Sequence, residues 1–157
     1  MILERSALGI ADDMVFVSGE IPRKTSFERG HIGQVRRTAD GGWENDEPLI
    51  DERWIGIEVK GKGLVVLSAC SHAGIVNVLM HANERFPNTP IHAVIGGLHL
   101  SGPNEAVIPQ TVEGLKPFAP KLIGAGHCTG WRAIAALSNA FGDQVLAPSA
   151  VGKRYSF

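Results

Sequence analysis

The residues from 63 to 85 constrain the fold more than any other part of the sequence. Residues 64–67 form an unbroken apolar run, which is typical of a strand buried on both faces. From residue 75 onward, apolar side chains recur at helical spacing: Ile75, Leu79, Ala82 and Phe86. The turn between them holds small and polar residues, among them Cys70 and His72. Because such a turn lies at the open end of a sheet, where polar groups converge, we expect the chemistry of the protein there.

The rest of the sequence alternates between strand and helix patterns. Further strands are predicted at residues 14–18, 54–59, 91–95, 121–124 and 144–147, and further helices at residues 109–116 and 131–141. Residues from about 20 to 50 are rich in glycine, charge and turn residues and predict a long loop, of the kind that serves as a lid or is ordered by a partner. The sequence therefore predicts a single α/β domain over residues 1–157.

The composition excludes several classes of function. Hydrophobic residues make up 44% and charged residues 20% of the chain, as in a globular protein. A net charge of -1 provides no general attraction for nucleic acid or for an anionic membrane, so neither is expected as a partner. No apolar run approaches the roughly 20 residues that span a bilayer, and the first residues do not resemble a secretory signal. We therefore expect a cytoplasmic protein in which Cys70 and Cys128 do not form a disulfide.

Three histidines each follow a predicted strand by a few residues, in a turn of small residues: His72, His99 and His127. Loops at one end of an α/β sheet share a cleft, and imidazole is a common ligand of zinc, iron and manganese, so the three predict a metal site. A hydrogen-bonded turn residue is the alternative for each one alone. Cys70 fits either a small buried side chain or a thiolate with a nearby histidine base.

Other polar residues receive simpler expectations. His31 in the long loop and His92 in a strand are given no chemical role. His81 is expected on the solvated side of its helix. Ser71 is expected to cap that helix through its hydroxyl group.

Several motifs together resemble a known family. They are Gly19-Glu-Ile-Pro-Arg23 with Phe27-Glu28, Ser68-Ala-Cys-Ser-His-Ala-Gly-Ile75, Gly96-Gly-Leu-His-Leu100, Gly126-His-Cys-Thr-Gly130 and Pro148-Ser-Ala-Val-Gly152. In order and spacing they resemble the C-terminal part of metallo-β-lactamase-fold metal-dependent hydrolases, in the dihydropterin-ribofuranosyl-aminobenzene-phosphate synthase-like subgroup. The resemblance implies the C-terminal half of an αββα sandwich, with a mixed sheet and helices on one of its faces.

The resemblance also implies a chemistry. In this family a hydroxide bound to one or two metal ions attacks a phosphoester or similar bond of a small-molecule substrate. His127 matches the last histidine ligand of the family, and His72 lies in its ligand-bearing turn. The bridging aspartate of that turn is absent, and either Cys70 or His72 stands nearest its place. His99 matches the lip of the site, where it could contact metal or substrate.

One departure from the family pattern changes these expectations. The sequence lacks the His-x-His-x-Asp-His motif that supplies much of the family's metal shell. We therefore expect an incomplete site that binds zinc, iron or manganese weakly or not at all in the isolated chain. A half sandwich also leaves an apolar sheet face uncovered, which predicts a homodimer or a separate chain that supplies the N-terminal half.

Three functions follow as hypotheses. The first is a metal-dependent hydrolase of esters, and the second is a catalytically inactive accessory or remnant module that acts through oligomerisation. The third is a thiol enzyme with Cys70 as its nucleophile and His127 or His72 as its base.

Overall fold

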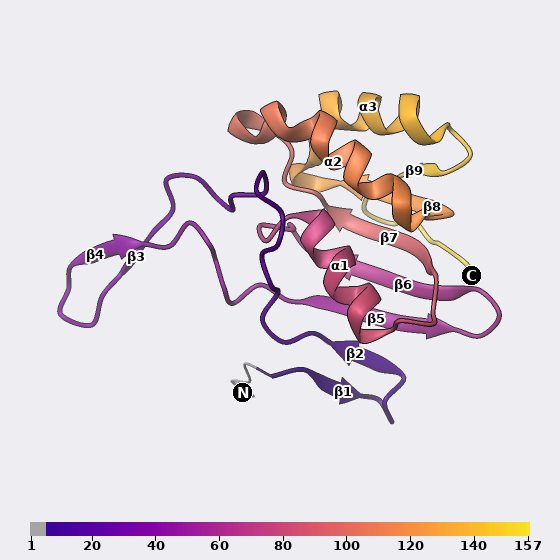
Figure 1. Ribbon diagram of the computed structural model, residues 1–157, viewed down its shortest axis with the longest axis horizontal. Coiled ribbons are helices and arrows are strands. Elements are labelled where there is room, and N and C mark those ends of the chain that lie inside the picture. Colours follow the sequence, from indigo (N-terminus) through magenta and orange to yellow (C-terminus); the bar gives the residue numbers. More distant parts are fainter. Residues whose placement is uncertain (1–5) are drawn as a thin grey trace.

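A seven-stranded mixed sheet forms the centre of the molecule (Figure 1). The computed structural model describes residues 6–157. Across the sheet the strands are β1 (Leu8–Ile10), β2 (Val15–Val17), β5 (Trp54–Val59), β6 (Gly63–Ser68), β7 (Ile91–Gly97), β8 (Leu122–Gly126) and β9 (Leu146–Pro148). Neighbours from β1 to β6 pair antiparallel, and neighbours from β6 to β9 pair parallel. The expected mixed sheet is confirmed.

Three α-helices connect the parallel strands. They are α1 (Ile75–Arg85), α2 (Ile108–Leu115) and α3 (Trp131–Phe141), accompanied by the short 3₁₀ helices η1 (Gly102–Val107), η2 (Lys116–Phe118) and η3 (His127–Thr129). Because the strand order advances in one direction from β6 to β9, right-handed crossovers place all three helices on the same face, as Figure 1 shows for α1 and α2 in front of the sheet. Within residues 6–157, no helix is long and apolar enough to cross a membrane.

The hydrophobic core lies between the sheet and these helices. Alternate residues of the central strands face it, including Leu64, Val66, Val94 and Ile123. Trp54 is fully buried at the β2 side of the core, and its ring centroid lies 5.1 Å from that of Phe16. Trp54 Nε1 also donates a hydrogen bond of 3.3 Å to Nδ1 of His81. The expectation of a simply solvated His81 is therefore wrong, because the indole of Trp54 needs an acceptor at the margin of the core.

The opposite face of the sheet is apolar and carries no helix. Strand pairing aligns Leu8, Val17, Ile55, Leu67 and Ile95 in one row across five strands. A second row contains Ile57, Val65, Ala93 and Leu122. Ile55 of the first row remains 38% exposed, whereas Val65 and Ala93 of the second row are buried. The C-terminal tail covers the β8 end of the face, where Tyr155 packs over Gly124. We call the first row the open face of the sheet.

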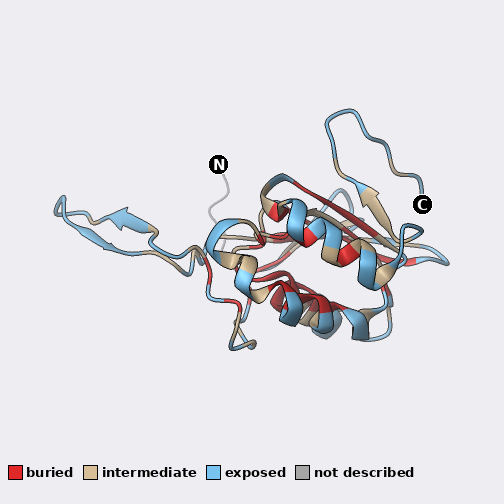
Figure 2. Ribbon diagram, turned by 90° about the horizontal axis from the view of Figure 1, so that it is seen from above, coloured by how far each residue is buried: buried red, intermediate tan, exposed pale blue. Residues whose placement is uncertain are grey.

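The long loop predicted between residues 20 and 50 contains a hairpin that the sequence pattern did not indicate. Strands β3 (Val35–Arg37) and β4 (Trp43–Asn45) pair antiparallel and project from the body as an arm (Figure 1). Figure 2 shows both strands exposed, and Trp43 is 66% exposed with Arg37 stacked over its ring. Strand β1 was also not predicted, because a three-residue strand has too short a pattern to detect.

A carboxylate from the N-terminal segment caps α1. Glu28 Oε1 accepts a hydrogen bond of 2.8 Å from Val76 N, and Oε2 accepts one of 2.9 Å from Asn77 N. The cap residue Gly74 has φ +92°, and a Cβ atom there would lie 2.0 Å from the Glu28 carboxyl carbon. Burial raises the pKa of Glu28, while the two backbone hydrogen bonds act to lower it. The prediction that Ser71 caps this helix is wrong, because its hydroxyl bonds to Ser68 and to the Gly97 carbonyl instead.

This cap leads to a prediction about stability. We expect Glu28→Ala to lower the free energy of unfolding by about 1–3 kcal/mol, because two N–H groups at the helix start lose their acceptor. Glu28→Gln keeps one acceptor oxygen and removes a desolvated charge, so its effect is expected to be smaller. Urea denaturation measures both, with Glu113→Gln as the control because Glu113 makes only an exposed ion pair with Lys116. An unchanged unfolding midpoint in Glu28→Ala would show that water replaces the cap.

Candidate metal centre

Three turns meet at one edge of the sheet, because β6, β7 and β8 run parallel and all end there. The turn after β6 carries Cys70 and His72, the turn after β7 carries His99, and η3 after β8 carries His127 and Cys128. The backbone is left-handed at His99 (φ 49°) and at His127 (φ 51°). Such a conformation costs a non-glycine residue about 1–2 kcal/mol, and residues held in it cluster at functional sites.

Small residues allow these turns to approach one another closely. A Cβ atom on Gly96 would lie 1.7 Å from the carbonyl oxygen of Ser68, and one on Gly97 would lie 2.7 Å from Cys128 Sγ. Thr129 then joins two turns, since its Oγ1 accepts a hydrogen bond from Leu98 N (3.1 Å) and donates one to Gly126 O (2.6 Å). The two glycines of the Gly-Gly-Leu-His-Leu motif are therefore required by close backbone packing.

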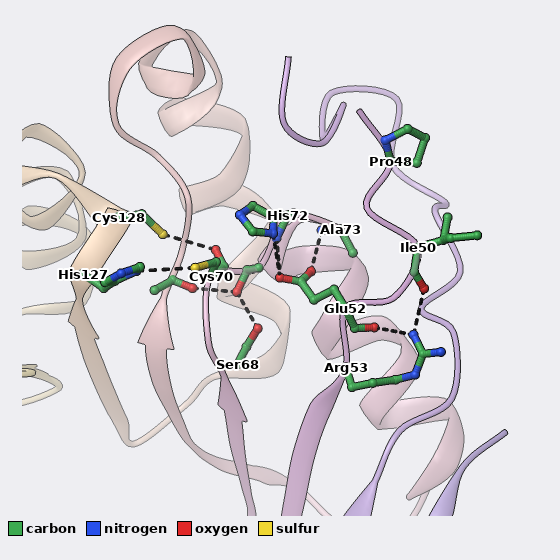
Figure 3. Close-up of polar contacts among 12 residues, drawn as sticks. Pro48, Ile50, Glu52, Arg53, Ser68, Cys70, His72, Ala73, His127 and Cys128 are labelled. Atoms are coloured by element: carbon green, nitrogen blue, oxygen red, sulfur yellow. Dashed lines mark hydrogen bonds and ion pairs between the residues drawn. The ribbon is translucent and has the colours of Figure 1, made fainter. Parts of the chain in front are cut away.

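One group of candidate ligands consists of Cys70, His127 and Cys128, which we call the thiol group (Figure 3). Cys70 Sγ lies 3.4 Å from His127 Nδ1, and Cys128 Sγ donates a hydrogen bond of 3.5 Å to the carbonyl oxygen of Cys70. The three ligand atoms all lie within 4.8 Å of one another. Both cysteines are free, as expected. Burial raises the pKa of the Cys128 thiol to about 11, so this thiol is protonated at neutral pH in the absence of a metal ion.

His72 is held by a carboxylate that the sequence reasoning missed. Glu52 accepts hydrogen bonds of 2.7 Å from the backbone N–H groups of His72 and Ala73, and its Oε1 lies 3.4 Å from His72 Nδ1 (Figure 3). The Glu52 side chain is only 8% exposed. Burial lowers the pKa of His72, against the opposing effect of Glu52. Glu52 lies at the end of the predicted loop, outside the quoted motifs, so no sequence signal identified it.

A second group of candidate ligands contains His31, His72 and His99, which we call the histidine group. The ring centroid of His99 lies 4.6 Å from that of His72 and 5.0 Å from that of His31, and the centroids of His31 and His72 are 5.7 Å apart. Burial lowers the pKa of His99 to about 4, with further contributions from His72, His31 and His127. Sequence reasoning gave His31 no role, because its loop has no recognisable pattern.

The predicted site residues thus fall into two neighbouring groups. His127 contacts Cys70, whereas His72 contacts His99 and Glu52. The turns that carry the two groups are joined, since Ser101 N after His99 donates a hydrogen bond of 3.2 Å to the carbonyl oxygen of Cys128. A pocket of about 220 Å³ beside the histidine group is lined by His31 and His99 together with Ser101, Pro103 and Asn104. This arrangement can hold a divalent cation and present it to a small molecule in the pocket.

Comparisons with known sequences and structures identify related proteins. The sequence matches no family model. It is 35% identical over 121 residues to 7,8-dihydropterin-6-methyl-4-(β-D-ribofuranosyl)-aminobenzene-5'-phosphate synthase from Methanocaldococcus jannaschii, over 76% of this chain. The structure resembles the crystal structure of a metal-dependent hydrolase of the β-lactamase superfamily, with a TM-score of 0.74 and 27% identity over 96% of this chain.

The chain is shorter than both of these proteins. It spans 40% of the length of the archaeal synthase and 56% of the crystallised hydrolase. The mixed sheet with helices on one face corresponds to the expected α/β architecture, and the fold class is confirmed. Sequence and fold together therefore confirm that the chain is similar to the metallo-β-lactamase-fold metal-dependent hydrolases, in the dihydropterin-ribofuranosyl-aminobenzene-phosphate synthase-like subgroup.

Proposed function

We propose that this chain supplies one side of a divalent-metal centre in a hydrolase that cleaves a phosphoester or another ester bond. The observation that carries the proposal is the meeting of three strand-end turns, which brings His72, His99, His127 and Cys70 to one edge of the sheet. Similarity to a metal-dependent hydrolase supports the same class of reaction. The archaeal relative is a synthase, so the bond that this chain acts on is part of the proposal.

The residues present fit a metal ion. Cys70, His127 and Cys128 offer two sulfur atoms and one nitrogen atom within 4.8 Å, and this donor set suits zinc better than manganese. Three protein ligands leave a coordination position open, as in catalytic zinc sites. A divalent ion bound there supplies Lewis acidity and makes water a stronger nucleophile near neutral pH. The surrounding turns hold the three side chains in place, and Glu52 fixes the adjoining turn of His72.

The pocket beside the site can take a small polar molecule. It has a volume of about 220 Å³ and is lined by His31, His99, Ser101 and Asn104, whose side chains can donate hydrogen bonds to phosphate oxygens. The archaeal relative is named for a product that carries a 5'-phosphate. A phosphorylated substrate therefore agrees with the residues of the pocket and with the chemistry of the relative's name.

The open face of the sheet supports association with a second polypeptide. Ile55 on this face is 38% exposed, and burying one Leu, Ile or Val side chain contributes about 1.5–3 kcal/mol. The similar hydrolase contains further chain beyond the region matched here. We propose that a second copy, or a chain that supplies the N-terminal half of the sandwich, covers this face. A catalytically inactive accessory module is the alternative, and it would use the same face.

Metal dependence tests the proposed activity. We expect the chain, purified without chelator and assayed with its covering partner, to contain zinc and to hydrolyse bis(p-nitrophenyl) phosphate. The double variant Cys70→Ser/Cys128→Ser should bind zinc more than about 10-fold more weakly, since even the outer partners of metal ligands change affinity by about 10- to 100-fold. Metal analysis after dialysis and the rate of nitrophenol release measure the two effects.

His92→Gln provides the control, because His92 packs against Phe157 away from the thiol group. Zinc binding without any turnover would contradict the hydrolase and support the accessory module. Rapid alkylation of Cys70 that persists in the presence of zinc, with a metal-independent turnover lost in Cys70→Ser, would instead support the thiol enzyme, for which the Cys70–His127 contact is also suited.

Oligomeric state tests the association. We expect a dimer in solution, and we expect Ile55→Lys to convert it to a monomer because the charge would lie on the open face. Ile134→Lys is a matched control: Ile134 lies on α3, on the helix side of the sheet, and is 36% exposed against 38% for Ile55. Light scattering at several concentrations measures the mass. A dilute monomer that binds no hydrophobic dye would overturn the association.

A further inference from the structure

The histidine group contains one residue that no motif of the family resemblance includes. His31 follows the Phe27-Glu28 motif and lies at the base of the β3–β4 arm. Its ring nevertheless lies against both His72 and His99, from different strand-end turns. Three imidazoles from three separate segments thus meet at one point.

Two nitrogen atoms in this group lack partners. Nδ1 of His31 and Nδ1 of His99 are buried and make no hydrogen bond within the described part of the chain. A buried polar atom without a partner costs about 1–3 kcal/mol, so such atoms are rare and call for a ligand, an ion or a water molecule. Simple packing of the rings leaves this cost uncompensated, whereas a cation bound by lone pairs removes it.

The ring separations correspond to those expected around a single ion. A Zn–N distance of about 2.0–2.1 Å places a ring centroid about 3 Å from the metal, and tetrahedral geometry then separates two centroids by about 5 Å. The observed separations are 4.6, 5.0 and 5.7 Å. Among the described residues, only the ligand atoms of the thiol group lie together within 4.8 Å, so the unpartnered imidazoles of His31 and His99 must rotate about Cβ–Cγ. Such a rotation exchanges the ring atoms that face the centre and leaves the centroids nearly unmoved.

The backbone around His31 is fixed. His31 N donates a hydrogen bond of 2.9 Å to the carbonyl oxygen of Glu47, and Gln34 N donates one of 3.1 Å to the carbonyl oxygen of His31. Gly30 has φ +89°, and a Cβ atom there would lie 2.2 Å from that same Glu47 oxygen. On the other side of the group, Glu52 orients the imidazole of His72 through Nδ1, which leaves Nε2 available as a ligand.

We propose that His31, His72 and His99 bind a divalent cation in a site that lies wholly within this chain, next to the thiol group. The inference deepens the proposed function and rests on it for the class of ligand. His31 adds an imidazole from the long loop to the ligands that the strand-end turns supply. One face of the site borders a pocket lined by His31, His99, Ser101 and Asn104, through which an ion and a substrate group can enter.

Cobalt(II) titration of the full chain tests the inference, because cobalt reports thiolate ligands by a charge-transfer band. We expect two cobalt ions per chain, of which only one produces this band. His31→Gln should retain the thiolate band and weaken the second ion more than about 10-fold. Cys70→Ser/Cys128→Ser should lose the band and retain the second ion, and His92→Gln should bind both ions as the wild type does.

The outcomes separate the two proposals. If His31→Gln binds both ions with unchanged affinity, or if the wild type binds only the ion with the thiolate band, the histidine site is wrong and the thiol group stands. If the wild type binds only the ion that depends on His31, the proposed role of the thiol group is wrong and the histidine site stands. Should His31→Gln fold poorly, NMR of the wild type decides: zinc must shift the imidazole signals of His31, and unmoved signals overturn the inference.

Discussion

Parallel pairing of β6, β7 and β8 is the constraint on which the rest of the structure depends. Three strands that run in one direction must end at one edge, so the turns that follow them are neighbours whatever their sequences. The crossover helices then fall on one face, and the other face carries no helix. Close contact between the turns in turn requires Gly96 and Gly97, because the backbone of the first turn occupies the space of a side chain. The parallel pairing of these strands therefore determines where the site, the helices and the open face lie.

The segment before β5 braces this edge. Glu28 caps α1 at its first turn, and Glu52 holds the turn that carries His72. Asn77 of α1 also binds this segment, since its Oδ1 accepts hydrogen bonds from Lys24 N and Thr25 N. Each of these contacts joins residues that are 20 or more positions apart in sequence. The long loop predicted at residues 20–50 thus supports the candidate site, and its β3–β4 arm projects away from the body (Figure 1).

Periodic features of the sequence were sufficient to predict the central elements. The change from an apolar run to helical spacing placed β6 and α1 within one residue of their observed bounds. Alternation located β5, and helical spacing located α3. Residues that act through long-range contacts carry no such signal. Glu28, Glu52 and His31 are isolated in sequence, and Ser71 was misjudged as a cap because a carboxylate 48 residues from Val76 in sequence occupies that role. The position of the three histidines at strand ends followed from the sequence, while their division into two groups depends on side-chain packing that no spacing encodes.

The central claim is that the edge formed by these strand-end turns is a metal centre. Anomalous diffraction from crystals grown with zinc tests it most directly, with data collected on both sides of the zinc absorption edge. The account predicts an anomalous difference peak at the strand-end edge, bordered by Cys70 and His127 or by His72 and His99. An edge without a peak, in crystals whose zinc lies only on surface residues elsewhere, would contradict it.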